Sequence, residues 1–121
     1  MNILIVDDSV SVRLHIVDIC NSHGYDTIEA NNGVEALEIL RQQPIDLLLT
    51  DINMPEMNGI ELLEAMKEEG ITTTSIAITT NVSPKTMEQA KQLGMKGWMI
   101  KPLNEAVFIS LLEKIDKKTT P

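Results

Sequence analysis

The stretch Ile3-Leu4-Ile5-Val6-Asp7-Asp8 is a short apolar run that ends in two carboxylates. Three later stretches share this form: Leu47-Leu48-Leu49-Thr50 before Asp51, Ile76-Ala77-Ile78 before Thr79, and Trp98-Met99-Ile100 before Lys101-Pro102. Each run is too short for a helix and suits a strand that is buried on both faces. Ligands of open parallel sheets bind beyond the carboxyl ends of the strands. The sequence therefore predicts one small site that contains three carboxylates, a hydroxyl group and an ammonium group.

Helix-length amphipathic stretches separate these runs, and this alternation is typical of βαβ units in an α/β fold. The predicted strands are residues 2–6, 25–30, 46–50, 75–79 and 97–100, with the second mixed in polarity as edge strands often are. The predicted helices begin at or just after Ser9, Asn32, Asn58, Ser83 and Asn104, and the last ends near Lys117. The first helix depends mainly on its capping residue, because the apolar residues that follow Ser9 alternate as those of a strand do.

Length and charge exclude several classes of protein. The 121 residues are enough for a single domain, residues 1–121, and no apolar stretch approaches the ~20 residues of a membrane span. The apolar start lacks the basic residues of a signal peptide, and Cys20 has no partner for an internal disulfide, so we expect a cytoplasmic protein. The net charge of −8 argues against nucleic-acid and anionic membrane partners and favours a protein or a cation.

The order of the elements resembles the flavodoxin-like doubly wound fold, a three-layer (βα)5 sandwich with parallel strand order 2-1-3-4-5. The resemblance implies that the first and third strands are neighbours, which would bring Asp7, Asp8 and Asp51 together. Carboxylates repel by about 4 kcal/mol per pair at ~4 Å when the effective dielectric constant is near 20. A retained proton, a lysine or a divalent cation must relieve this repulsion.

Oxygen ligands with open positions suit Mg²⁺, which binds carboxylates and phosphate oxygens together. Asp7 and Asp8 are the predicted metal ligands, and Lys101 would supply a further positive charge. Asp51 is the predicted nucleophile, because its strand is central and the rigid Met54-Pro55 turn follows it. A carboxylate in such a setting can attack a phosphoryl group and form an aspartyl phosphate.

Four motifs, in order, resemble those of the response regulator receiver family. They are Ile5-Val6-Asp7-Asp8-Ser9, then Asp51-Ile52-Asn53-Met54-Pro55-Glu56-Met57-Asn58-Gly59, then Thr79, then Lys101-Pro102. The resemblance covers about residues 2–115 and is of the stand-alone, CheY-like type. An Asp-Asp pair alone is common turn and cap chemistry, whereas the ordered set is highly specific.

The resemblance implies that Asp51 accepts a phosphoryl group from a phosphohistidine on a sensor histidine kinase or a phosphotransfer protein. It also implies that Mg²⁺ is held by Asp7 or Asp8, by Asp51 and by the backbone carbonyl of Asn53.

The resemblance further implies a switch. Thr79 and Lys101 would bind the phosphoryl oxygens, and the Lys101-Pro102 bond would be cis. Thr79 would couple to the aromatic residue of the last strand, which is Trp98. Phosphorylation would then change the affinity of an output protein for the face formed by the fourth helix, the fifth strand and the fifth helix.

A phosphorylatable switch is the leading interpretation. Only residues 117–121 follow the last helix, so output is expected through another protein, with chemotaxis-type motor control favoured over a phosphorelay. We expect the protein to be a signalling switch and not an enzyme, because it would promote only its own phosphorylation and dephosphorylation. A phosphatase of the haloacid-dehalogenase type needs a second acid where Asn53 stands. A non-phosphorylated scaffold also stays open, because Thr80 and Trp98 depart from the common receiver pattern.

Overall fold

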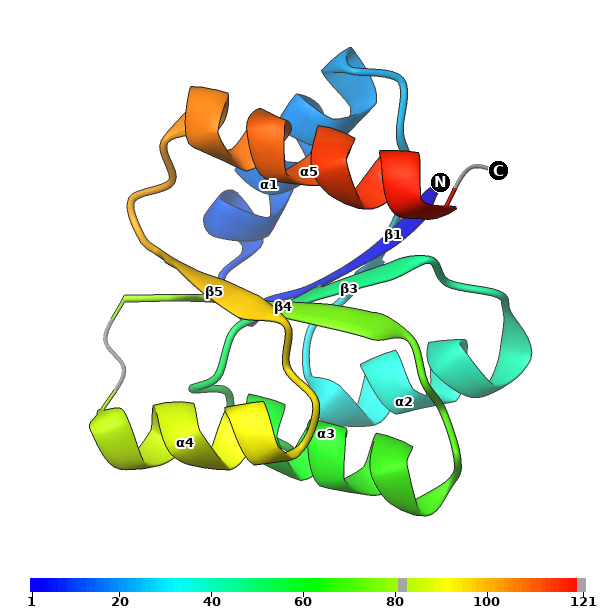
Figure 1. The fold of residues 1–121 in the computed structure, drawn as a ribbon, viewed down its shortest axis with the longest axis vertical. Helices are drawn as coiled ribbons and strands as arrows, with labels where there is room; N and C mark the ends of the chain where they lie inside the picture. The colour runs from blue at the N-terminus through cyan, green and yellow to red at the C-terminus, as the bar shows by residue number, and fades with distance from the viewer. Residues whose placement is uncertain (81–82, 120–121) are drawn as a thin grey trace.

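A five-stranded parallel sheet forms the middle of three layers, and its strand order is β2-β1-β3-β4-β5. The computed structural model describes residues 1–80 and 83–119. The strands are β1 (Asn2–Val6), β2 (Asp26–Ala30), β3 (Leu47–Thr50), β4 (Thr74–Thr79) and β5 (Gly97–Ile100). The helices are α1 (Val10–Ser22), α2 (Gly33–Gln42), α3 (Gly59–Glu68), α4 (Pro84–Gln92) and α5 (Glu105–Thr119). Figure 1 shows α1 and α5 on one face of the sheet and α2, α3 and α4 on the other, which confirms the predicted fold.

The central strands β1 and β3 are largely apolar because helices cover both faces of the sheet, whereas the edge strand β2 is mixed in polarity. In β1, Ile3 and Ile5 belong to the core cluster that includes residues of α1 and α5. Leu4 and Val6 belong to the cluster on the side of α2, α3 and α4. These four side chains are at most 1% exposed, so β1 lies in the interior of the molecule. Among the residues described, no helix is long and apolar enough to cross a membrane.

Helix α1 forms despite its strand-like pattern. The Ser9 hydroxyl accepts a hydrogen bond from the Val12 backbone N–H at 3.4 Å and caps the helix, as predicted. Val10 and Leu14 are 56% and 46% exposed, whereas Ile16 is buried. The alternation arises because Val10 and Leu14, one helical turn apart, are apolar and yet face solvent. These two exposed residues obscure the helical spacing of the buried ones.

Two predicted strands begin one residue too early. Tyr25 was predicted to start the second strand, but its backbone N–H donates to the Cys20 carbonyl at the end of α1. Asp46 was predicted to start the third, but its carboxylate accepts from the Asn2 backbone N–H at 2.7 Å, below the start of β3. Both residues close the turns that lead into the sheet.

Helix α4 is attached to the sheet by a small contact. Its only buried residue is Ala90, which belongs to the same core cluster as Ala77 of β4. Trp98 of β5 is half-buried and packs against this cluster. The burial of α4 against the core therefore depends on one small side chain.

The loop from β3 to α3 passes close to two glycines. A Cβ atom on Gly59 would lie 2.7 Å from the Asp51 carbonyl oxygen and 2.9 Å from the Ile52 Cα. A Cβ atom on Gly33 would lie 2.6 Å from the Met57 carbonyl oxygen. Because backbone atoms make these approaches, a larger residue would force the loop outward and move the backbone of Asp51.

Gly59→Ala is expected to lower the free energy of unfolding by about 1–3 kcal/mol, because the new methyl group overlaps backbone that has no room to relax. Gly97→Ala is the matched control, since its Cβ would meet only the Ile76 Cδ1 atom, at 3.6 Å. Denaturant titration of both variants measures the difference. Equal effects would show that the β3–α3 loop yields easily.

Cys20 gives a test of core burial. Burial raises the pKa of its thiol to about 11, whereas an exposed cysteine ionises near ~8.5. Between these values the unfolded chain releases the proton and the folded chain keeps it, so the free energy of unfolding should fall as pH rises. Denaturant titrations from neutral to alkaline pH should show a smaller fall in Cys20→Ala than in the wild type. Parallel profiles would contradict burial of the thiol.

Candidate functional site

The carboxyl ends of β1 and β3 bring Asp7 and Asp51 together. Val6 is paired with Thr50 in the sheet, and the Asp51 backbone N–H donates to the Val6 carbonyl at 3.0 Å. Asp7 and Asp51 are 2% and 8% exposed. The Thr50 hydroxyl donates to the Asp51 carbonyl at 2.9 Å and is itself buried. Asp51 therefore stands on a backbone that is fixed from both sides.

Lys101 joins the two carboxylates. Its ammonium Nζ lies 2.7 Å from Asp7 Oδ2 and 3.0 Å from Asp51 Oδ2. Burial by itself lowers the pKa of Lys101, but the hydrogen bonds and charges of Asp7 and Asp51 outweigh this effect and raise the pKa above its usual value. The lysine is therefore charged at neutral pH. The Lys101-Pro102 peptide bond is cis, as the family resemblance implied.

Asp7 and Asp8 have different surroundings. Asp7 Oδ1 accepts from the Ser9 backbone N–H at 2.8 Å, so both oxygens of the Asp7 carboxylate have donors. Asp8 is exposed, and its carboxylate has no partner among the residues that the structure describes. Oxygen atoms of Asp7, Asp8 and Asp51 all lie within 4.8 Å of one another. Asp8 is thus the carboxylate most available to a cation.

The remaining predicted site residues surround this cluster. The backbone N–H of Asn53 donates to Asp51 Oδ1 at 3.3 Å, and its side chain is exposed. Thr79 is fully buried at the end of β4, where its carbonyl accepts from the Lys101 N–H at 2.8 Å. Trp98 lies opposite Ala77 in the register of β4 and β5, one strand away from β3.

The cluster has the donors that a hard cation requires. Three carboxylates and one ammonium leave a formal charge of −2, and every available ligand atom is an oxygen. Mg²⁺ prefers carboxylate and carbonyl oxygens and keeps open positions for water or phosphate. The residues present therefore fit Mg²⁺, with the lysine as a second, built-in positive charge.

One residue of this region was not predicted. Arg13 of α1 is 8% exposed, and its Nη1 donates to the Asp7 carbonyl oxygen at 2.6 Å. Its Nε donates to Glu29 Oε1 at 2.9 Å. The signal in the sequence was weak: Arg13 is the only Lys or Arg between the first and second predicted strands.

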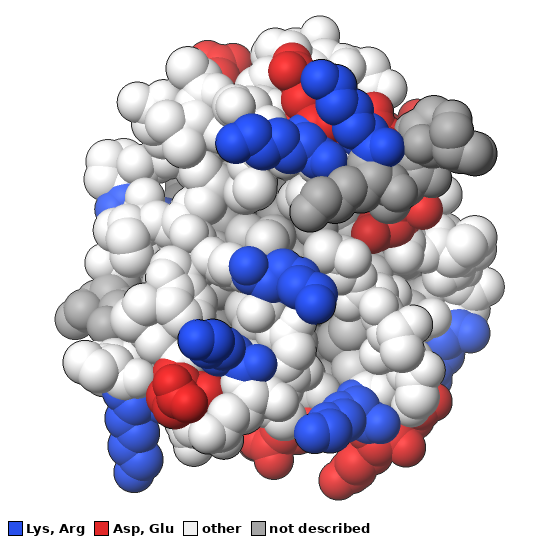
Figure 2. Space-filling view, in the orientation of Figure 1, with Lys and Arg blue, Asp and Glu red and all other residues white. Residues whose placement is uncertain are grey.

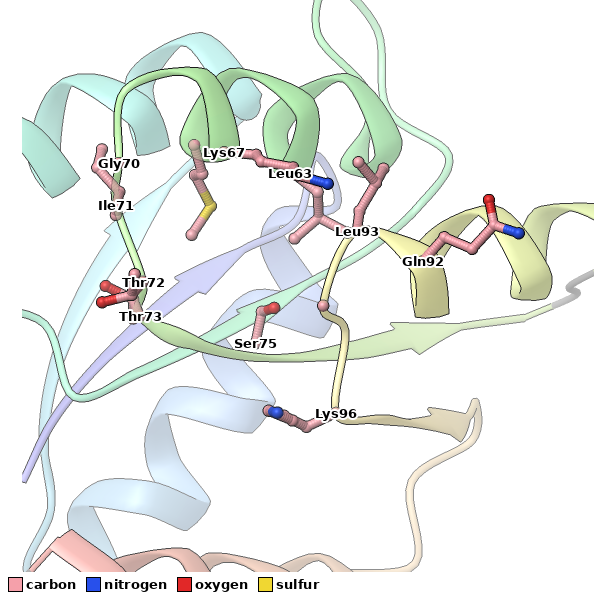
Figure 3. Close-up of a pocket in the computed structure, with 12 residues that line it drawn as sticks. Leu63, Lys67, Gly70, Ile71, Thr72, Thr73, Ser75, Gln92, Leu93 and Lys96 are labelled. Carbon is pink, nitrogen blue, oxygen red and sulfur yellow. The ribbon is translucent and has the colours of Figure 1, made fainter.

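Two hollows differ in their relation to the cluster. One, of about 380 Å³, lies between α3, α4 and the beginnings of β4 and β5. Figure 3 shows Ser75 pointing from β4 toward Leu63 in this hollow, at the end of the sheet opposite the carboxylates. A second, of about 420 Å³, lies beside Lys101 and is lined by residues of α1 together with Thr80 and Leu103. Only the second shares a residue with the cluster.

Comparisons with known sequences place the chain among signalling domains. A sequence model of the response regulator receiver domain matches residues 3–113. Sporulation initiation phosphotransferase F of Bacillus subtilis is 35% identical over 102 residues, which cover 84% of this chain and 82% of that protein. Sensor histidine kinase RcsC of Salmonella typhimurium is 35% identical over 103 residues, which cover 85% of this chain and 11% of the kinase. The chain thus spans a small part of the length of such sensor kinases.

Solved structures agree with this placement. Chemotaxis protein CheY4 of Vibrio cholerae superposes with a TM-score of 0.87 at 31% identity, over 94% of this chain and 97% of that chain. A CheY-like receiver domain from Methanospirillum hungatei gives a TM-score of 0.88 at 28% identity, over 98% and 95% of the two chains. With the sequence match over residues 3–113, these similarities show that the chain belongs to the response regulator receiver domain family.

Proposed function

We propose that this receiver domain is a phosphorylation switch in which Asp51 accepts a phosphoryl group from a phosphohistidine. The observation that carries the proposal is the position of the Lys101 ammonium, 3.0 Å from Asp51 Oδ2 and 2.7 Å from Asp7 Oδ2. A lysine held in this way can bind a phosphoryl oxygen when the group reaches Asp51. The donor is a sensor histidine kinase or a phosphotransfer protein.

The transfer needs little acid–base chemistry. An Asp51 carboxylate oxygen attacks phosphorus, the O–P bond forms as the N–P bond of the phosphohistidine breaks, and the electron pair of that bond stays on the imidazole nitrogen. Negative charge spreads over three phosphoryl oxygens in the transition state, so positioned cations and donors stabilise it. Lys101 supplies the fixed ammonium, and Thr79 is proposed to supply a hydroxyl to the phosphoryl group.

The predicted cation completes the set. Asp8, Asp51 and the backbone carbonyl of Asn53 are the proposed Mg²⁺ ligands, while Asp7 contributes charge and holds Lys101. When bound, Mg²⁺ would neutralise the excess negative charge of the cluster and polarise the phosphoryl oxygens. The donor set of this chain thus suits phosphoryl transfer better than proton abstraction.

The phosphohistidine donor is proposed to dock against α1. Val10 and Leu14 are exposed apolar residues on this helix, and the hollow beside Lys101 has Val12 and Leu103 in its lining. Apolar side chains that surround a charged site favour a protein partner over a small ionic one. A phosphohistidine carried on a helix would meet both this apolar surface and the Asp51 site.

Output is proposed to use the face of α4, β5 and α5. Ile100 and Val107 are 55% and 57% exposed there, and Trp98 helps to line a hollow of about 500 Å³ between β5 and α5. Figure 2 shows this face, on which Lys and Arg side chains are interspersed with Asp, Glu and uncharged residues. Such a mixed surface suits a protein partner, whereas nucleic acid requires a continuous basic patch.

Receiver similarity leaves the pathway to experiment. CheY4 is a chemotaxis protein and the Bacillus subtilis relative is a sporulation initiation phosphotransferase, so proteins of two different processes are similar to this chain. We propose a cytoplasmic switch that promotes only its own phosphorylation and dephosphorylation. A phosphatase is disfavoured because Asn53, two residues after Asp51, offers an amide where a second acid is needed.

Acetyl phosphate and Mg²⁺ should add one phosphoryl group to the wild type, and Asp51→Asn should gain none. The reason is that Asp51 is the proposed phosphoryl acceptor, and its Oδ2 lies 3.0 Å from the Lys101 ammonium. Intact-mass spectrometry with and without Mg²⁺ measures the gain. No gain at any Mg²⁺ concentration would remove the switch and leave a scaffold that binds partners constitutively.

Thr79→Val should accept the phosphoryl group yet lose most of the change in Trp98 fluorescence that accompanies phosphorylation. The substitution keeps the shape of the buried side chain and removes the hydroxyl proposed to move toward the phosphoryl group. Thr74→Val, at the opposite end of β4, is the control and should behave as the wild type does. A full fluorescence change in phosphorylated Thr79→Val would exclude this route from Asp51 to Trp98.

A further inference from the structure

Arg13 is a buried cation that lies outside the carboxylate cluster but is bonded to its backbone. The residue is 8% exposed, and its Nη1 donates to the carbonyl oxygen of Asp7 at 2.6 Å. That carbonyl belongs to the peptide that joins Asp7 to Asp8. The Arg13 side chain thus contacts the peptide between Asp7, whose carboxylate is hydrogen-bonded, and Asp8, whose carboxylate has no partner among the described residues.

We propose that Arg13 is a positioning residue that fixes the direction in which Asp8 leaves β1. The inference rests on the proposed function, in which Asp8 is a Mg²⁺ ligand. Holding the Asp7 carbonyl fixes the plane of the Asp7–Asp8 peptide, because a peptide unit is planar and its carbonyl direction sets the path of the next residue. Asp8 then presents its carboxylate to the cluster without a bond of its own.

The other atoms of Asp7 explain why this carbonyl matters. The Asp7 N–H donates to the Ala30 carbonyl at 3.2 Å, Oδ1 accepts from the Ser9 N–H, and Oδ2 accepts from Lys101. Arg13 supplies the donor for the remaining polar atom. Every polar atom of Asp7 is therefore bonded, and Asp7 becomes a rigid base from which the exposed Asp8 extends.

Glu29 anchors the arginine from the opposite direction. The Arg13 Nε lies 2.9 Å from Glu29 Oε1, on the edge strand β2. A guanidinium group presents its donors in a fixed planar fork, so the two bonds together set the position of the donor that reaches Asp7. A lysine carries the same charge but cannot make both contacts in this fixed geometry.

The charge of Arg13 and its positioning role predict opposite effects of its removal on the affinity for Mg²⁺. A positive charge near the cluster opposes binding of Mg²⁺, so removal of Arg13 would tighten binding if charge were its only contribution. If Arg13 positions Asp8, its removal weakens binding. Partners that orient metal ligands from outside typically contribute 10–100-fold to affinity.

The test is Mg²⁺ titration of the full chain, followed by the NMR shifts of the Asp8 and Asn53 backbone amides. Arg13→Met should raise the dissociation constant for Mg²⁺ about tenfold. Arg13→Lys keeps the charge and should also weaken binding, though less. Arg41→Met is the matched control, because Arg41 forms a comparable pair with Glu69, at 2.7 and 2.6 Å, between α2 and α3. That variant should bind Mg²⁺ as the wild type does.

A second measurement needs no metal. Hydrogen exchange of the Asp8 and Ser9 amides should be faster in Arg13→Met and Arg13→Lys than in the wild type, and unchanged in Arg41→Met. Unchanged or tighter Mg²⁺ binding in both Arg13 variants, while the wild type binds Mg²⁺, would overturn the positioning role and leave the proposed function standing. Absence of Mg²⁺ binding by the wild type would instead overturn the proposed function, and the inference with it.

Discussion

The whole arrangement depends on an ammonium group held between two carboxylates that would otherwise repel each other. Asp7 and Asp51 end adjacent strands, whereas Lys101 follows β5 at the edge of the sheet. Its side chain therefore crosses the ends of β4 and β3 to reach β1. Salt screens buried charges poorly, so the fold itself must supply the cation. The ends of β1, β3 and β5 are thus coupled through a single nitrogen atom. Any event that draws Lys101 away from Asp7 changes the surroundings of both Asp7 and Lys101.

The sequence predicted the fold well because its signals were local and numerous. Buried runs with a polar residue at the carboxyl end specify a parallel sheet, and the capping residue Ser9 marked the start of α1, which apolar spacing left ambiguous. The strand order came from family resemblance, since nothing in the spacing of the runs determines which strands are neighbours. The two early strand starts have different causes: Tyr25 bonds the nearby Cys20 at the end of α1, whereas Asp46 bonds the distant Asn2, and neither bond leaves a mark in the apolar pattern.

The sequence predicted which residues form the site but not how the surroundings of Asp7 and Asp8 differ. The sequence treats Asp7 and Asp8 as equivalent, and only the structure shows that Asp7 is bonded on every side while Asp8 is exposed. This difference depends on Lys101 and on Arg13. Lys101 is far from Asp7 in the sequence, and Arg13 lies on α1, outside the strand that Asp7 follows. Side-chain reach across strands leaves no periodic trace in a sequence, and for that reason Arg13 escaped prediction.

Helix α4 shows what a weak attachment permits. Because Ala90 is its only buried residue, separating this helix from the core would expose little apolar surface. Such an excursion would carry a small heat-capacity change and a small dependence on denaturant, unlike unfolding of the whole chain. Openings of this kind belong to the low end of the range of local stabilities in a native protein. A rearrangement of α4, one wall of the proposed output face, would therefore cost little apolar burial and leave the buried strands and the acidic cluster in place.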